Sequence, residues 1–80
     1  MLKLEDILNI ISNSTEIESS KVNINTSSEN LEEWDSLAHL AILTAIDKKT
    51  NGKTASISNL SEATSVDSIL EILREHGLAE

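Results

Sequence analysis

The chain has 80 residues, a formal net charge of −8, no cysteine, no proline, two glycines and Trp34 as its one aromatic residue. These counts exclude disulfide bonds, thiolate metal sites and a nucleophilic thiol among the side chains, and the negative charge argues against nucleic acid as a partner. The acidity suits encounters with basic patches on other proteins, although it serves equally well to keep a small protein in solution. Eighty residues allow one small domain with an aliphatic core, and the lack of proline favours helices. We therefore expect an all-α fold and a single domain, residues 1–80.

The first predicted element is an amphipathic helix of about three turns. Its apolar residues recur at helical spacing: Leu4, Ile7, Leu8 and Ile11. The pattern fades over residues 12–14, where Asn13 is a candidate C-cap. Acidic residues interrupt the chain from Glu5 onward, so no long apolar run forms. This argues against a signal peptide or a membrane span and favours the cytoplasm.

A long polar loop is predicted from residue 14 to about residue 34. Val22, Ile24 and Leu31 are its strong apolar residues, and we expect them to hold the loop against the core, with a short turn after Ser28. Loops of this length are usually functional or disordered. Four acidic residues without a basic neighbour close this stretch, and they form either a recognition patch or a solvated approach to the next helix: Glu29, Glu32, Glu33 and Asp35.

The second predicted helix runs from Ser36 to about Thr50, with Asp35 as its N-cap and Asn51-Gly52 as a left-handed C-terminal cap. Helical periodicity turns one set of side chains toward the core: His39, Ile42, Leu43 and Ile46. The opposite face carries Leu37, Leu40, Ala41, Thr44 and Lys48. Two outward leucines beside Ser36 favour a contact surface there.

Two further helices are predicted after the second one. A short helix spans Ile57–Ala63, with Ser58 as its cap and with Ile57 and Leu60 turned inward. The last helix is capped by Ser65 and closed by Gly77, and its apolar residues repeat at helical spacing: Val66, Ile69, Leu70 and Leu73. The chain is thus expected to form a small four-helix bundle of three main helices and one short helix, with a long first loop.

The chain has an acidic domain, a long first loop and the tripeptide Asp35-Ser36-Leu37 at the start of the second helix. In these features it resembles the acyl carrier proteins. The resemblance extends from Leu4 to Leu78 and is sharpest over Leu31–Leu37. In that family the serine of the motif carries 4′-phosphopantetheine, which a phosphopantetheinyl transferase takes from coenzyme A. The resemblance implies that Ser36 is the attachment residue, that the fold is of the acyl-carrier type, and that the protein is a non-catalytic carrier of acyl thioesters in biosynthesis of the fatty acid or polyketide type. The implied partners are the transferase, an acyl-activating enzyme, and an acyltransferase or synthase.

Several positions depart from the carriers of primary fatty acid synthesis. Those proteins usually bear acidic residues along the exposed face of the second helix and small residues before the motif. Here Ala38 and Ala41 occupy the helix positions, and Glu33 and Trp34 precede the motif. We therefore expect a specialised, stand-alone and monomeric carrier for a dedicated pathway. Its expected partner-binding residues are Glu32, Glu33, Asp35, Leu37, Leu40 and Ala41.

Other functions stay open on the sequence. An aminoacyl or peptidyl carrier would share the motif and architecture, and an unmodified helical interaction module would differ only at Ser36 Oγ. A hydrolase using Ser36 and His39 would also need an orienting carboxylate and an oxyanion hole, so His39 is better interpreted as a hydrogen-bonded, partly buried side chain or as part of an acyl-chain lining. An aliphatic interior could open to admit an acyl chain, although a well-packed core gives the same pattern. No metal site is expected, because His39 and His76 are far apart and the acids lack the ligand spacing of a calcium loop.

Overall fold

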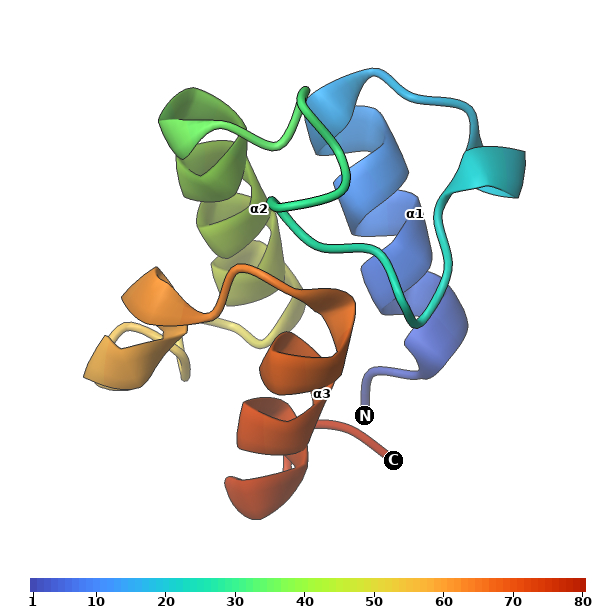
Figure 1. Ribbon diagram of the computed structural model, residues 1–80. Coiled ribbons are helices and arrows are strands. Elements are labelled where there is room, and N and C mark those ends of the chain that lie inside the picture. The colour runs from blue at the N-terminus through green and yellow to red at the C-terminus, as the bar shows by residue number, and fades with distance from the viewer.

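Helices make up all of the regular secondary structure in the computed structural model, which describes residues 1–80 (Figure 1). The three α-helices are α1 (Leu4–Thr15), α2 (Ser36–Lys49) and α3 (Val66–Glu75), and two short 3-10 helices are η1 (Ser19–Lys21) and η2 (Ser58–Glu62). The predicted all-α class is confirmed. The short helix predicted at Ile57–Ala63 corresponds to η2, which is a 3-10 helix of five residues. No helix combines the length and the apolar character that crossing a membrane would require.

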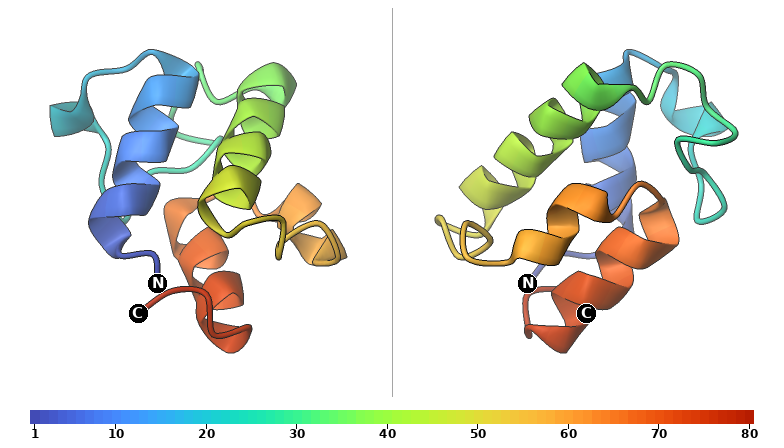
Figure 2. Two further views of the ribbon diagram at one scale, coloured as in Figure 1. Left: turned by 180° about the vertical axis from the view of Figure 1, so that it is seen from behind. Right: turned by 60° about the vertical axis from the view of Figure 1, so that its left-hand side comes forward.

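The core lies where the three α-helices meet. α1 and α2 lie side by side, and α3 lies beneath both of them in the views of Figures 1 and 2. Each helix turns its apolar face inward, and the fully buried side chains come from all three: Ile7, Ile11, Ile42, Ile46, Val66, Ile69 and Leu73. Aliphatic residues thus supply almost the whole core, as the near absence of aromatic residues requires.

α1 is longer than the sequence predicts. It continues to Thr15, and the left-handed residue that ends it is Glu16, with φ 59°, so the prediction of Asn13 as C-cap is wrong. The hydroxyl of buried Thr15 donates to the Ile11 carbonyl within the helix, which lets a polar side chain extend it. The core face is also shifted, because Ile10 is buried whereas Leu4 is exposed.

The loop between α1 and α2 is tied to the segment that precedes α3. Ser28 N–H donates to the Thr64 carbonyl, and Val66 N–H donates to the Thr26 carbonyl. Val22 is buried and Leu31 is partly buried against the core, as predicted, but Ile24 is exposed. The predicted turn after Ser28 is present at residues 28–30. The loop is therefore folded onto the body of the protein.

The predicted limits of α2 and α3 agree with the structure. Asp35 caps α2, and the helix ends at Lys49 with Thr50 as its C-cap, followed by left-handed Asn51 and Gly52. Ser65 caps α3 by accepting from Ser68 N–H, and Gly77 with φ 70° follows the helix end. One cap is wrong: Ser58 is the first residue of η2, the cap position belongs to Ile57, and no side chain caps it. Ile57 and Leu60 are buried, as predicted.

The two chain ends meet at the end of the molecule away from the start of α2 (Figure 1). Leu2 N–H donates to the Leu78 carbonyl at 2.9 Å, and Glu80 N–H donates to the Leu2 carbonyl at 2.9 Å. Leu2 and Ala79 form an isolated parallel bridge, and both are buried. The terminal segments are thus part of the packed structure.

Candidate functional site

Ser36 is the first residue of α2, and its side chain is exposed. The residue before it makes the cap: the Asp35 carboxylate accepts from Ala38 N–H at 2.9 Å. The Ser36 hydroxyl takes no part in this cap and forms no hydrogen bond within the chain. It therefore stands free at the positive end of the helix dipole, where an attached anion is favoured. The predicted N-cap and the predicted exposure of Ser36 are both confirmed.

A buried histidine lies one turn further along α2. The Trp34 indole N–H donates to His39 Nδ1 at 3.1 Å, and His39 Nε2 lies 3.1 Å from the Leu60 carbonyl oxygen. The indole can only donate and the carbonyl can only accept, so these partners assign the proton to Nε2 and leave Nδ1 as the acceptor. We call this arrangement of Trp34, His39 and the Leu60 carbonyl the indole–imidazole bridge. It joins the loop, α2 and η2.

The bridge decides how His39 is interpreted. Both ring nitrogens have partners other than Ser36, and the side chain is only 8% exposed. The interpretation of His39 as a hydrogen-bonded buried residue is confirmed, and in this arrangement no ring nitrogen is free to take a proton from Ser36 Oγ. Trp34 was not predicted as the partner of His39. A donor-only indole five residues before an inward-facing histidine was the available signal, but the sequence does not show where the loop places the ring.

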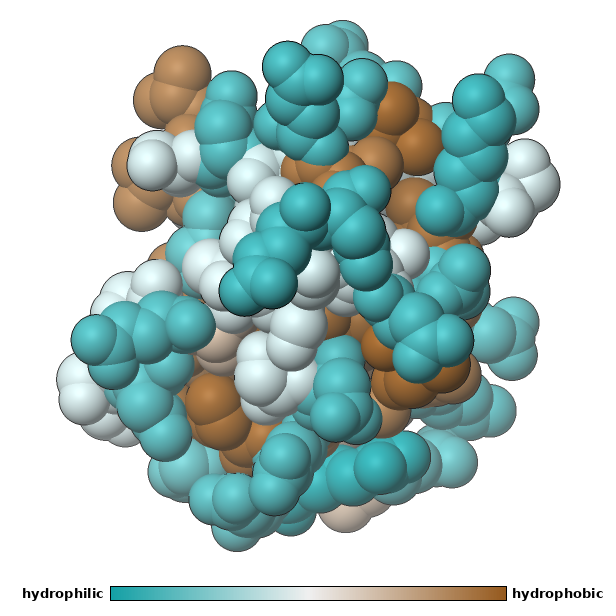
Figure 3. All heavy atoms as spheres, viewed as in Figure 1, coloured by the Kyte–Doolittle hydropathy of each residue, from teal (hydrophilic) through white to brown (hydrophobic).

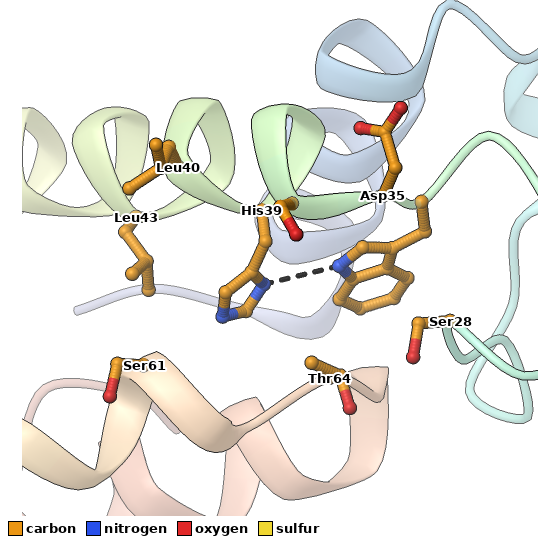
Figure 4. A pocket seen from close by; sticks show the side chains of 9 residues that line it. Ser28, Asp35, His39, Leu40, Leu43, Ser61 and Thr64 are labelled. Atoms are coloured by element: carbon orange, nitrogen blue, oxygen red, sulfur yellow. Dashed lines mark hydrogen bonds between the residues drawn. The ribbon is translucent and has the colours of Figure 1, made fainter.

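A groove lies between α2 and the segment around η2 (Figure 4), and Ser36 is one of the residues that line it. It has a volume of about 600 Å³, and nine residues line it: Ser28, Trp34, Asp35, Ser36, His39, Leu40, Leu43, Ser61 and Thr64. A second hollow of about 490 Å³ shares Leu43 and Ser61 with the groove and reaches Thr54 and Asp47. Ser28 and Thr64 join the lining because the loop is hydrogen-bonded to the segment before α3.

The outward face of α2 is apolar close to Ser36. Leu37 is 77% exposed and Leu40 is 61% exposed, and Ala41 is also exposed. Hydrophobic atoms project from the molecule along the edge formed by α2 (Figure 3). Ala38 does not belong to this face: it is buried, with 7% exposure, so the expectation that it occupies an exposed position is wrong. The helix turns Ala38 toward the end of α1.

The six predicted partner-binding residues are all exposed: Glu32, Glu33, Asp35, Leu37, Leu40 and Ala41. Three of them, Glu33, Asp35 and Leu37, border a hollow of about 340 Å³ between the end of α1 and the start of α2. Leu40 and Asp35 border the groove on the other side of Ser36. Glu32 and Ala41 line neither. Asp35 thus borders both hollows, whereas Ser36 lines the groove only.

No three side chains among His, Cys, Asp and Glu come together in a way that could hold a metal ion. His76 is exposed after α3, with Nδ1 2.9 Å from the Ile72 carbonyl oxygen, and it is remote from His39 in the chain. Comparison of the chain with protein-family models, with curated proteins and with solved structures found no match.

Proposed function

We propose that the protein is a non-catalytic carrier that holds acyl groups on a 4′-phosphopantetheine arm attached to Ser36 Oγ. The observation that carries the proposal is a free serine hydroxyl, exposed at the first residue of a capped helix and in the lining of a groove. The tripeptide Asp35-Ser36-Leu37 supports it through its resemblance to the acyl carrier proteins. We extend that resemblance to the fold as well, with η2 in the place of the short helix that precedes the last helix of an acyl-carrier bundle.

The surroundings of Ser36 fit such an arm. Its hydroxyl is unhindered, and attachment would form a bond from Oγ to the β-phosphorus of coenzyme A, break the diphosphate bond and release adenosine 3′,5′-bisphosphate, while the hydroxyl proton goes to a base on the transferase. The negative phosphodiester would lie at the N-terminus of α2, next to its unpaired N–H groups. The arm supplies a thiol that holds the acyl group as a thioester. Tethering raises the effective concentration of the cargo for the enzymes that bind the carrier.

The proposed partners are a phosphopantetheinyl transferase, an acyl-activating enzyme, and an acyltransferase or synthase, met by a monomeric carrier in the cytoplasm. Leu37, Leu40 and Ala41 offer an apolar contact, and Glu32, Glu33 and Asp35 offer negative charge to basic groups on a partner. Apolar anchors supply most of the binding energy in such contacts, whereas exposed charges mainly speed and orient the encounter.

Two alternatives share parts of this site. An aminoacyl or peptidyl carrier would use Ser36 in the same way and differ in cargo. An unmodified interaction module would use the exposed Leu37 and Leu40 without any arm.

Intact-mass measurement tests the proposal. After incubation with coenzyme A and a promiscuous phosphopantetheinyl transferase, the protein is expected to gain the mass of one arm. Ser36→Ala is expected to gain nothing, whereas Ser61→Ala, which changes another serine of the same groove, is expected to be modified normally. An unmodified wild-type protein, with a positive control carrier modified in the same tube, would leave the interaction module as the better description.

A further inference from the structure

We infer that the indole–imidazole bridge closes the interior of this carrier to long hydrocarbon chains, and that its cargo is a short acyl group bearing a hydroxyl or an amine, held in the groove. This inference rests on the proposed attachment at Ser36. It adds the chemical class of the cargo, which the motif around Ser36 does not specify.

Trp34 and His39, the two side chains of the bridge, line the same groove as Ser36. A cargo on Ser36 reaches the groove between α2 and η2, and the aliphatic core lies beneath its floor. His39 Nε2 joins α2 to the Leu60 carbonyl of η2, and Nδ1 joins α2 to Trp34 of the loop. Figure 4 shows the indole and imidazole rings side by side, with Leu43 on one flank and Ser28 on the other. A chain that entered between α2 and η2 beside His39 would have to displace this bridge.

Displacement by hydrocarbon is unfavourable because of what the bridge contains. Trp34 and His39 are 3% and 8% exposed, so water does not readily replace their hydrogen bonds. An alkyl chain offers neither a donor nor an acceptor, and its entry would leave the indole N–H and the two imidazole nitrogens unpaired. In an interior held only by aliphatic contacts, the same entry would exchange one apolar contact for another. The bridge therefore disfavours insertion of an alkyl chain into the interior.

The groove outside the bridge offers hydroxyl groups that can bind a small polar group on the cargo. Its lining includes the hydroxyl-bearing residues Ser28, Ser61 and Thr64. Ser28 and Thr64 use their hydroxyls in no hydrogen bond within the chain, whereas the Ser61 hydroxyl donates to the Ser58 carbonyl. Free hydroxyls can pair with a cargo hydroxyl or amine.

Two loaded forms of the protein test the inference. A promiscuous transferase attaches the acyl-arm from 3-hydroxybutyryl-coenzyme A or from dodecanoyl-coenzyme A, and intact mass verifies each product. The single tryptophan gives one indole N–H resonance. Its position and its hydrogen-exchange rate report whether the bridge opens.

Both cargoes are expected to leave the indole resonance in place and its exchange rate within about twofold of the unloaded arm-bearing protein. The dodecanoyl thioester is expected to react with hydroxylamine as fast as the same thioester on free pantetheine. The 3-hydroxybutyryl thioester is expected to be slowed relative to its free counterpart, and Thr64→Val is expected to remove that slowing. A dodecanoyl cargo that moves the resonance and speeds indole exchange by about tenfold or more would overturn the inference.

Variants of the bridge complete the test. Trp34→Phe removes one donor and keeps an aromatic ring, and His39→Leu removes both links. If the bridge is the barrier, either variant lets the dodecanoyl chain enter the interior. The dodecanoyl thioester is then expected to react more slowly with hydroxylamine. If the folded Trp34→Phe protein still leaves that thioester fully reactive, the bridge is not the barrier and the inference is wrong. A failure of loading, seen as an absent mass gain at Ser36, would instead count against the proposed function itself.

Discussion

The Trp34 indole nitrogen lies 3.1 Å from His39 Nδ1, so the residue just before the cap of α2 is hydrogen-bonded to the second turn of the same helix. These are the two positions at which a hydrophobic staple fixes the direction in which a chain enters a helix. Here a hydrogen bond between buried rings makes that connection. Because Asp35 and Ser36 lie between the two residues, the bond also fixes where the Ser36 hydroxyl is presented.

Trp34→Phe tests the contribution of this bond to stability. The change keeps an aromatic ring but leaves His39 Nδ1 without its donor, and a buried unpaired group costs about 1–3 kcal/mol. We expect the free energy of unfolding, measured with urea, to fall by that amount. Ser61→Ala, in the same groove but exposed, should change it by less than about 0.5 kcal/mol. Equal stability of Trp34→Phe and wild type would show that the bond adds nothing to folding.

Asp35→Ala tests the cap of α2. The carboxylate accepts from Ala38 N–H, and loss of an N-cap acceptor costs about 1 kcal/mol. Thermal unfolding should show a lower Tm for Asp35→Ala, and Asp35→Ser should restore most of it because serine also accepts from the helix N–H groups. If alanine and serine lowered the Tm equally, the charge of Asp35 and not its capping would be what matters.

Leu37→Ala and Leu40→Ala test whether the outward face of α2 binds partner proteins. Both side chains are mostly exposed, so we expect each change to alter the free energy of unfolding by less than about 0.5 kcal/mol. The rate of modification by the transferase at limiting carrier concentration should fall for both. Thr44→Ala, on the same face one turn beyond Leu40, is the matched control and should leave the rate unchanged. A large drop in Tm would mean that the leucines serve the core.

Ile46→Ala tests the packing between the helices. Ile46 is fully buried, and truncation of such a side chain costs roughly 2–5 kcal/mol. In a domain of this size that is a large part of the total stability, and circular dichroism should show partial unfolding or a strongly lowered Tm. The same truncation at exposed Ile24 should be close to neutral. Similar losses at both positions would contradict the burial pattern.

Local patterns in the sequence predicted the two helices that position the site. The caps at Asp35 and Ser65 and the Asn51-Gly52 ending are short-range features, set by residues within a few positions of one another. The predicted end of α1 was wrong because the helix continues to buried Thr15, and the burial of a residue depends on the tertiary fold. Ala38 was misplaced for the same reason, since the neighbouring end of α1 covers it.

The groove and the indole–imidazole bridge lay beyond what the sequence could predict. Both depend on how the first loop is placed against the segment before α3, through the bond from Ser28 N–H to the Thr64 carbonyl. Helical periodicity predicted that His39 faces the core, but it did not indicate which groups its ring nitrogens bind. Residues that meet only through long-range backbone pairing leave no local pattern to detect.

The pairing of Leu2 with the Leu78–Glu80 segment has a practical consequence for handling the protein. Since both ends emerge together, far from the start of α2 (Figure 1), an affinity tag or a solid support attached there would leave the Ser36 hydroxyl facing solution. The same proximity would let a short peptide join the ends, so that a circularly permuted chain could be opened at an exposed turn such as Asn51-Gly52.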